Sequence, residues 1–301
     1  MYVITALLPL IGLISLGFIL KQRHFVSEEF WRDAEKLNYY ILFPALLFSS
    51  LAWVELKLQQ LTSVLGVVVL TIAVVSAVLW GLKVALQLEA KEFGVYVQSH
   101  IRFNTYIGLS LMGILFAAPG MQMFSMIIAV AIPIVNILSV LALLPKQQRD
   151  LKQILMTVVK NPLILGCVAG IGFNLSGLSL ADALQQWLKL LAGCSLPLGL
   201  LAVGAALQFD ALKQAFNALI LNSLGRLVLV PLCAYGVAQG FHLSPFEMTV
   251  VMVFFALPTA SSAYVLTRHL KGNAELMAGV ISLQTVLFVG SLPLLMWALH
   301  G

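Results

Sequence analysis

The chain has 301 residues, of which 61% are hydrophobic and only 10% are charged, and its mean hydropathy is +1.01. Soluble domains carry about 25% charged residues, so this composition excludes an ordinary soluble protein and predicts an integral membrane protein. The formal net charge of +5 does not indicate a nucleic-acid partner, because the basic residues are spread over short connections and form no stripe.

Ten apolar segments follow one another along the chain, most of them close to the length of about 20 residues that crosses a bilayer. We predict an all-α polytopic protein with ten transmembrane helices over residues 3–20, 37–54, 61–82, 95–116, 122–144, 161–175, 188–207, 214–238, 246–268 and 275–299. The first segment has no basic region before it and no small-residue cleavage site after it. We therefore interpret it as a retained helix and not as a signal peptide.

The second half of the chain repeats features of the first half at an offset of 153 to 154 residues. The matched pairs are Pro9 with Pro162, Pro44 with Pro197, and Asn104 with Pro258. Each half has five segments, and because five is odd, two copies must lie upside down relative to each other. Such inverted repeats are typical of secondary transporters. We predict a first five-helix repeat at 1–145, a cytoplasmic link at 146–160 and a second, inverted repeat at 161–301.

The basic residues predict the orientation in the membrane, because cytoplasmic connections are enriched in lysine and arginine. Thirteen basic residues lie in alternate connections: Lys21, Arg23, Arg32, Lys36, Lys83, Lys91, Lys146, Arg149, Lys152, Lys160, Lys213, Arg268 and Lys271. The other connections have only Lys57 and Lys189. We expect both termini on the non-cytoplasmic side, and the short loops fit a bacterial inner membrane.

The fourth and ninth segments combine polar side chains with residues that weaken helices. Pro258 removes a backbone donor inside an apolar segment, which membrane proteins tolerate where other helices or water satisfy the freed carbonyl. Asn104 and Thr105 take the equivalent place in the first half. We predict that both helices are broken and cross at mid-membrane. Their exposed N-termini would suit a carboxylate.

Asn104 is the strongest single candidate ligand, since its amide donates two hydrogen bonds, although it would serve equally as a contact between helices. The predicted substrate-binding set is Asn104, Thr105, Ser110, Pro258, Thr259, Ser261 and Arg226, with His100, Asn136 and Gln284 as helper or proton-linked residues. Arg226 lies inside the eighth segment, where it could attract an anion, extend toward the interface or pair with a carboxylate. For Arg102, near the cytoplasmic end of its segment, we expect extension toward the interface.

Several other kinds of chemistry lack support in the sequence. All twelve acidic residues fall in connections or near segment ends, so coupling to protons or sodium ions through a buried carboxylate has no candidate. The three cysteines have no paired spacing, and no nucleotide, zinc-protease or hydrolase motif occurs. We therefore expect no enzyme activity, no cofactor and no metal.

Four sequence stretches resemble the auxin efflux carrier family, which includes plant auxin exporters and bacterial dicarboxylate carriers. They are Leu-Asn-Tyr-Tyr-Ile-Leu-Phe-Pro-Ala-Leu-Leu-Phe-Ser-Ser-Leu (37–51), Arg-Phe-Asn-Thr-Tyr-Ile-Gly-Leu (102–109), Lys-Asn-Pro-Leu-Ile (160–164) and Ala-Leu-Pro-Thr-Ala-Ser-Ser-Ala-Tyr-Val-Leu (256–266). Asn104 matches the family's crossover asparagine and Pro258 its proline in helix nine. Ser110 stands where the family usually has proline. The lack of a long central loop is similar to the bacterial short-loop branch.

The resemblance implies a scaffold of helices 1, 2, 6 and 7, often dimeric, and a transport domain of helices 3–5 and 8–10. It also implies that a small organic anion, such as malate, malonate or an auxin-like acid, crosses the bilayer by an elevator motion. Two alternatives stay open at this point. One is a sodium-coupled organic-anion symporter similar to the bile-acid carriers, and the other is a membrane sensor or passive channel.

Overall fold

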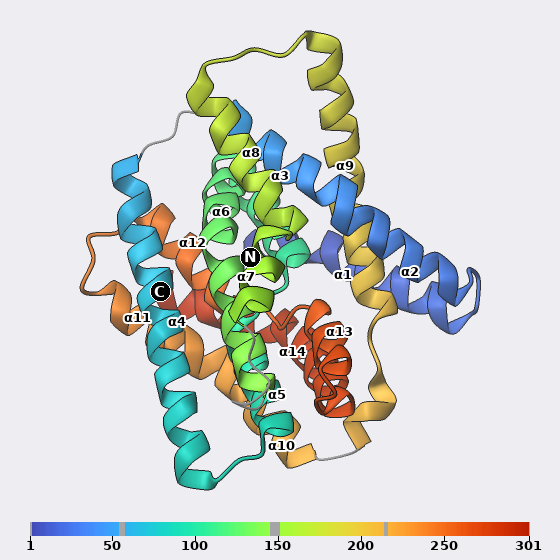
Figure 1. Ribbon diagram of the computed structural model, residues 1–301, viewed down its shortest axis with the longest axis vertical. Helices are drawn as coiled ribbons and strands as arrows, with labels where there is room; N and C mark the ends of the chain where they lie inside the picture. The colour runs from blue at the N-terminus through green and yellow to red at the C-terminus, as the bar shows by residue number, and fades with distance from the viewer. Residues whose placement is uncertain (1, 54–57, 145–150, 214–215, 301) are drawn as a thin grey trace.

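The computed structural model describes residues 2–53, 58–144, 151–213 and 216–300, and every regular element in these ranges is helical (Figure 1). The predicted all-α class is therefore confirmed. The α-helices are α1 (Tyr2–Gln22), α2 (Glu28–Leu37), α3 (Phe43–Ala52), α4 (Leu58–Leu86), α5 (Ala90–Ile101), α6 (Thr105–Leu143), α7 (Leu151–Val159), α8 (Pro162–Ser176), α9 (Asp182–Ala205), α10 (Phe216–Leu224), α11 (Val230–Ala238), α12 (Pro245–Ala256), α13 (Ser262–His269) and α14 (Ala274–His300). A 3₁₀ turn, η3 (Phe209–Lys213), precedes α10.

Six helical stretches of the described chain are long and apolar enough to cross a membrane. They are Val3–Gln22, Leu61–Leu86, Ala90–Leu143, Asp182–Ala205, Phe216–Ala238 and Ala274–Leu299. The apolar helices α8 and α12 are shorter than this length. Each of the ten predicted ranges is largely helical in its described residues, but several consist of two pieces or merge with a neighbour. The arrangement as ten spans in inverted repeats stays a prediction.

The predicted fourth and fifth segments follow each other without a loop inside α6. Ala117 has a φ of 50° and a ψ of −136°, which no helix contains, and it lies two residues before Pro119. Pro119 has no N–H to donate, so the helical hydrogen bond that would pass across Ala117 is missing. α6 is thus bent sharply between the two predicted segments.

Two helices each contain one π-helical turn that ends just before a proline. The π-helical turn η1 (Asn38–Leu42) joins α2 to α3, and η4 (Gly225–Leu229) joins α10 to α11. Pro44 and Pro231 follow within two residues. Proline has no N–H to donate, so the regular pattern of α-helical hydrogen bonds is interrupted at each proline. The wider hydrogen-bonding pattern of the π turn precedes this interruption in both helices. The helix of the predicted 37–54 segment therefore begins already at Glu28.

Helices α1, α3, α8 and α9, which correspond to the predicted scaffold, pack on one another, with α3 along α8 and α1 along α9. Both pairs depend on glycine for their close approach. A Cβ at Gly204 of α9 would overlap the backbone oxygen of Ile14 in α1, and a Cβ at Gly166 of α8 would press on Pro44 of α3. Small residues allow such contacts between membrane helices. The division into scaffold and transport domain stays a prediction.

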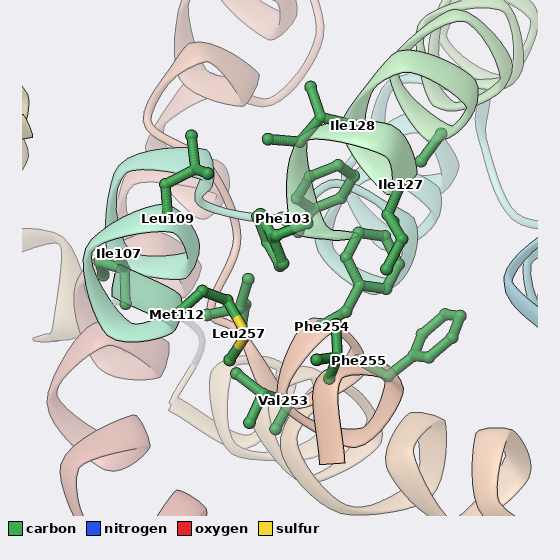
Figure 2. Close-up of a cluster of buried hydrophobic side chains, with 14 of the residues drawn as sticks. Phe103, Ile107, Leu109, Met112, Ile127, Ile128, Val253, Phe254, Phe255 and Leu257 are labelled. Carbon is green, nitrogen blue, oxygen red and sulfur yellow. The ribbon is translucent and has the colours of Figure 1, made fainter. Parts of the chain in front are cut away.

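Buried aromatic and aliphatic side chains fill the space between α6 and α12 (Figure 2). The ring of Phe103 lies 4.4 Å, centroid to centroid, from that of Phe254 and 6.4 Å from that of Phe124. Phe103 comes from the short connection between α5 and α6, and Phe254 lies near the end of α12. This cluster fixes the connection after α5 against the helix that ends beside it.

Candidate functional site

Two interrupted helices touch at their breaks. The first break is residues 102–104, between α5 and α6, and the second is residues 257–261, between α12 and α13. The backbone N–H of Asn104 donates a hydrogen bond to the carbonyl of Pro258 at 2.9 Å. Both predicted breaks are therefore present and in direct contact, and we call these two segments together the crossing.

The three residues of the first break all border one cavity, and Phe103 also packs into the hydrophobic cluster. Arg102 (φ −81°, ψ 143°) and Asn104 (φ −79°, ψ 102°) are both extended, and side chains alternate along extended backbone. Phe103 between them is 3% exposed and packs on Phe254. Arg102 and Asn104 both line this cavity beside the crossing.

Asn104 caps α6 and keeps one donor group free. Its Oδ1 accepts a hydrogen bond from the N–H of Ile107 at 3.1 Å, which satisfies one donor of the first helical turn. Its Nδ2 is buried and has no hydrogen-bond partner among the described residues, and the residue as a whole is only 2% exposed. A buried amide donor without a partner is costly, so this atom is a candidate hydrogen-bond donor to a ligand.

The cavity has a volume of about 560 Å³, which is within the usual size of small-molecule sites. Four of the predicted residues line it, namely Asn104, Thr105, Asn136 and Ser261. The first residues of α6 and α13 are at its wall. Both helices thus direct the positive ends of their dipoles to this space.

Positive side chains outnumber negative ones around the cavity. Arg32, Lys36 and Arg102 line it, with Glu35 as the acidic residue among the described lining and His269 as a further basic group. Glu35 precedes the segment predicted to cross the membrane, and burial raises the pKa of its carboxyl above the ordinary value. The charge balance favours an anionic ligand.

The cavity opens toward the charged face of α2. Arg32, Lys36, Tyr40 and His269 in its lining are exposed. A smaller cavity of about 220 Å³ shares Arg32 with it, and Glu35, Ser261 and Val265 as well. The open side carries residues of the connection that the basic residues predict to be cytoplasmic.

Arg226 lies at the crossing but not in the cavity. It belongs to η4, and its side chain is buried. Its Nε donates to the carbonyl of Leu257 at 2.7 Å and its Nη1 to the carbonyl of His100 at 2.6 Å, while Nη2 has no partner. These carbonyls are at the C-terminal ends of α12 and α5, where helix dipoles are negative. Arg226 therefore braces the first halves of both broken helices.

Three further predicted residues hold the second break in place. The Oγ1 of Thr259 lies 2.9 Å from the carbonyl of Ser99 and 2.7 Å from Oε1 of Gln284, and its N–H donates to the same Oε1 at 3.0 Å. Pro258 contributes its carbonyl to Asn104. None of the three lines a described cavity.

His100 and Ser110 also lie away from the cavity. The Nδ1 of His100 is 2.8 Å from the carbonyl of Tyr96, and the ring packs against Gly225. Ser110 is buried inside α6, six residues after the break. The serine in place of the family's proline therefore leaves the break at 102–104 intact.

The sequence reasoning assigned Arg102 to the interface, but the structure places it in the cavity wall. Its Nη2 donates to Oγ of Ser262 at 3.2 Å, and its Nη1 is buried without a partner. Asn161, Tyr39 and Tyr106 also line the cavity, and the predictions omitted them. Asn161 caps α8 and lies in one of the four stretches that resemble the family. This position is the sequence feature that could have identified it as a site residue.

The described part of the chain has no group of three or more histidine, cysteine or acidic residues that could hold a metal ion. Cys167, Cys194 and Cys233 are free thiols. What the site offers chemically is therefore hydrogen-bond donors, hydroxyls and positive charge around a small space.

Comparison with known proteins gives two matches. A family model described as "Membrane transport protein" matches residues 2–296. An "Uncharacterized transporter" of Methanothermobacter thermautotrophicus is 26% identical over 293 residues, which is 95% of each chain.

Proposed function

The chain belongs to the membrane transport protein family, the auxin efflux carrier family that its motifs resemble, and we propose that it is a secondary transporter of a small organic anion. One observation supports this above all. The buried Nδ2 of Asn104 has no hydrogen-bond partner among the described residues and lies where two broken helices meet a positively charged cavity.

In this proposal a carboxylate of the substrate accepts a hydrogen bond from Asn104 and lies at the N-terminal ends of α6 and α13. Thr105, Ser261 and Asn136 supply further polar contacts from the cavity wall. Helix N-termini favour anions. The two breaks would therefore contribute to substrate affinity, because they expose the N-terminal N–H groups of α6 and α13 to the carboxylate. A carboxylate, a dicarboxylate such as malate or malonate, or an auxin-like acid would fit the volume.

We further propose an elevator-type alternating-access mechanism over ten spans in two inverted repeats. Helices α1, α3, α8 and α9 would form the scaffold and the dimer contact. Helices α4 to α6 and α10 to α14 would carry the crossing through the bilayer. With the positive-inside orientation, the cavity open toward α2 corresponds to an inward-facing state, and both termini lie outside the cytoplasm.

The contacts of Arg226 weigh against the sodium-coupled alternative. Carbonyls at the ends of interrupted membrane helices are suitable ligands for a sodium ion. Here the carbonyls of His100 and Leu257 already accept hydrogen bonds from the guanidinium. The guanidinium of Arg226 thus occupies the carbonyl oxygens that a sodium ion would otherwise bind. We therefore expect transport without a sodium gradient.

Counterflow in proteoliposomes tests the proposal. Vesicles loaded with unlabelled malate, malonate or an indole carboxylate should take up the labelled acid saturably without an ion gradient. A sensor would not transport, and a passive channel would give no counterflow above equilibration. Absence of exchange for every acid by folded protein would contradict the proposal, and strict dependence on sodium would favour the symporter.

Asn104→Ser tests the site itself. Serine keeps an N-cap acceptor for α6 but removes the amide donor. Loss of a hydrogen bond to a charged group should raise KM on the order of 10- to 100-fold. Asn174→Ser is the matched control, because the Asn174 amide donates to the carbonyl of Ala52 outside the cavity. An unchanged KM in Asn104→Ser would remove Asn104 from the site.

A further inference from the structure

We infer that Arg102 is a second anion-binding group of this site, and that it makes the site select substrates with a second negative charge, separate from the one held by Asn104. The inference rests on the proposed function. It concerns a residue whose sequence position indicated only extension toward the interface.

The guanidinium of Arg102 is incompletely satisfied where it lies. Ser262 accepts one hydrogen bond from Nη2 at 3.2 Å, while Nη1 is buried without a partner. Neither the ion pair of Lys21 with Glu28 nor that of Arg32 with Asp33 includes Arg102. Arg102 is half-buried, and the burial of its Nη1 without a partner has a desolvation cost. An anion that enters the cavity would offset this cost.

Arg102 and Asn104 provide two separate unpartnered donors on one wall. They are two residues apart in an extended segment, and each residue of such a segment advances the chain by about 3.3 Å. Their backbone atoms are therefore roughly 6 to 7 Å apart, and the longer arginine side chain reaches farther from the break. A substrate with two carboxylates could accept hydrogen bonds from both donors, one carboxylate from Asn104 and the other from Arg102. A single carboxylate bound to Asn104 would leave the Arg102 donor without a partner.

The remaining charges support the same assignment. Arg32, Lys36 and Arg102 outnumber Glu35 in the described lining, although Arg32 also pairs with Asp33. This predominance of positive charge favours a substrate with more than one negative charge. Arginine also suits a carboxylate better than lysine does, because its planar donors match the two oxygens.

The test measures KM in counterflow for pairs of acids of similar size with one or two carboxylates, such as butyrate and succinate. In Arg102→Gln we expect KM for the diacid to rise about 10- to 100-fold, and KM for the monoacid to change less than about threefold. Arg102→Lys should restore part of the diacid affinity because it keeps the charge. Arg268→Gln removes an exposed positive charge nearby and should leave both values unchanged.

Ser262→Ala separates binding from structure. If Arg102 serves only to connect the two breaks through Ser262, Ser262→Ala will reproduce the loss seen in Arg102→Gln. If Arg102 binds the substrate, Ser262→Ala will lose much less diacid affinity than Arg102→Gln. Equal losses for both acids, or none, in folded Arg102→Gln would overturn the inference and leave the proposed function standing. Failure of the wild-type protein to exchange any acid would overturn both.

Discussion

Two arginines lie at the crossing, Arg102 within it and Arg226 against it, and their surroundings differ. Arg226 donates to two carbonyls at the C-terminal ends of α5 and α12, while Arg102 has one serine hydroxyl and borders the cavity. The first is satisfied mainly by the negative ends of helix dipoles. The second has no comparable acceptor inside the protein.

This difference indicates that the two kinds of helix end at the crossing have different roles. Breaking two helices at one point produces two C-terminal ends and two N-terminal ends. Arg226 neutralises the former permanently, so the latter are left with a net attraction for an anion. The stability of the crossing and its affinity for substrate should therefore depend on different arginines, and each variant below tests that separation.

The largest effect should come from Arg226→Gln. Loss of the buried cation leaves the carbonyls of His100 and Leu257 without charged donors, and each hydrogen bond to a charged group contributes about 1.5 to 3 kcal/mol. Thermal unfolding of the detergent-purified protein should show a clearly lower Tm, with Arg226→Lys intermediate. A Tm equal to that of the control Arg268→Gln would contradict the bracing role.

Gly225→Ala should weaken the same brace from the other side. A Cβ at Gly225 would overlap Nε2 of His100, and this ring belongs to the residue whose carbonyl accepts from Arg226. Overpacking a close contact costs about 1 to 3 kcal/mol. The Tm should fall, and Gly236→Ala, where a Cβ has nothing within 4 Å, is the matched control. Equal Tm values for the two variants would show that the ring moves aside freely.

Thr259→Val should have a smaller effect on the second break. Valine keeps the shape of threonine but removes the hydroxyl that lies between Ser99 and Gln284, which costs about 1 to 2 kcal/mol when buried acceptors lose their partner. Because Thr259 is outside the cavity, KM should change little while Tm falls. A large rise of KM at unchanged Tm would instead place Thr259 in contact with the substrate, as the sequence predicted.

The sequence predicted the helical class and the position of both breaks because these follow from local chemistry. Proline at 258 removes a helical hydrogen bond, and asparagine at 104 is a preferred N-cap residue. Proline alone does not fix a break, because Pro9 and Pro197 lie inside α1 and α9. The number of membrane spans is harder to derive from helix length, because the breaks and the π-helical turns divide several predicted spans into shorter α-helices. The contact between Asn104 and Pro258 could be expected only from the repeat that relates them.

The sequence could not separate residues that line the cavity from residues that brace the crossing. Ser261 and Thr259 are two residues apart and both polar, yet only Ser261 lines the cavity. Both roles need hydrogen-bonding side chains near the break, so composition does not distinguish them. Arg226 illustrates a second difficulty. The π-helical turn η4 adds a residue to its helix. A regular helical period therefore assigns Arg226 to a different face of the helix from the one it occupies.

The smallest effect on stability is expected for Arg102→Gln, and it sharpens the comparison most. Arg102 is half-buried, and its hydrogen bond to Ser262 joins it to a neutral hydroxyl, so the unfolding free energy should stay within about 1 kcal/mol of the wild type. The same Tm measurement as for Arg226→Gln checks it, in the absence of any acid. Adding a diacid should then raise the Tm of the wild type more than that of Arg102→Gln, because only a bound ligand stabilises the folded state. A fall in Tm as large as that of Arg226→Gln would show that both arginines are braces, and the separation of stability from affinity at this crossing would be wrong.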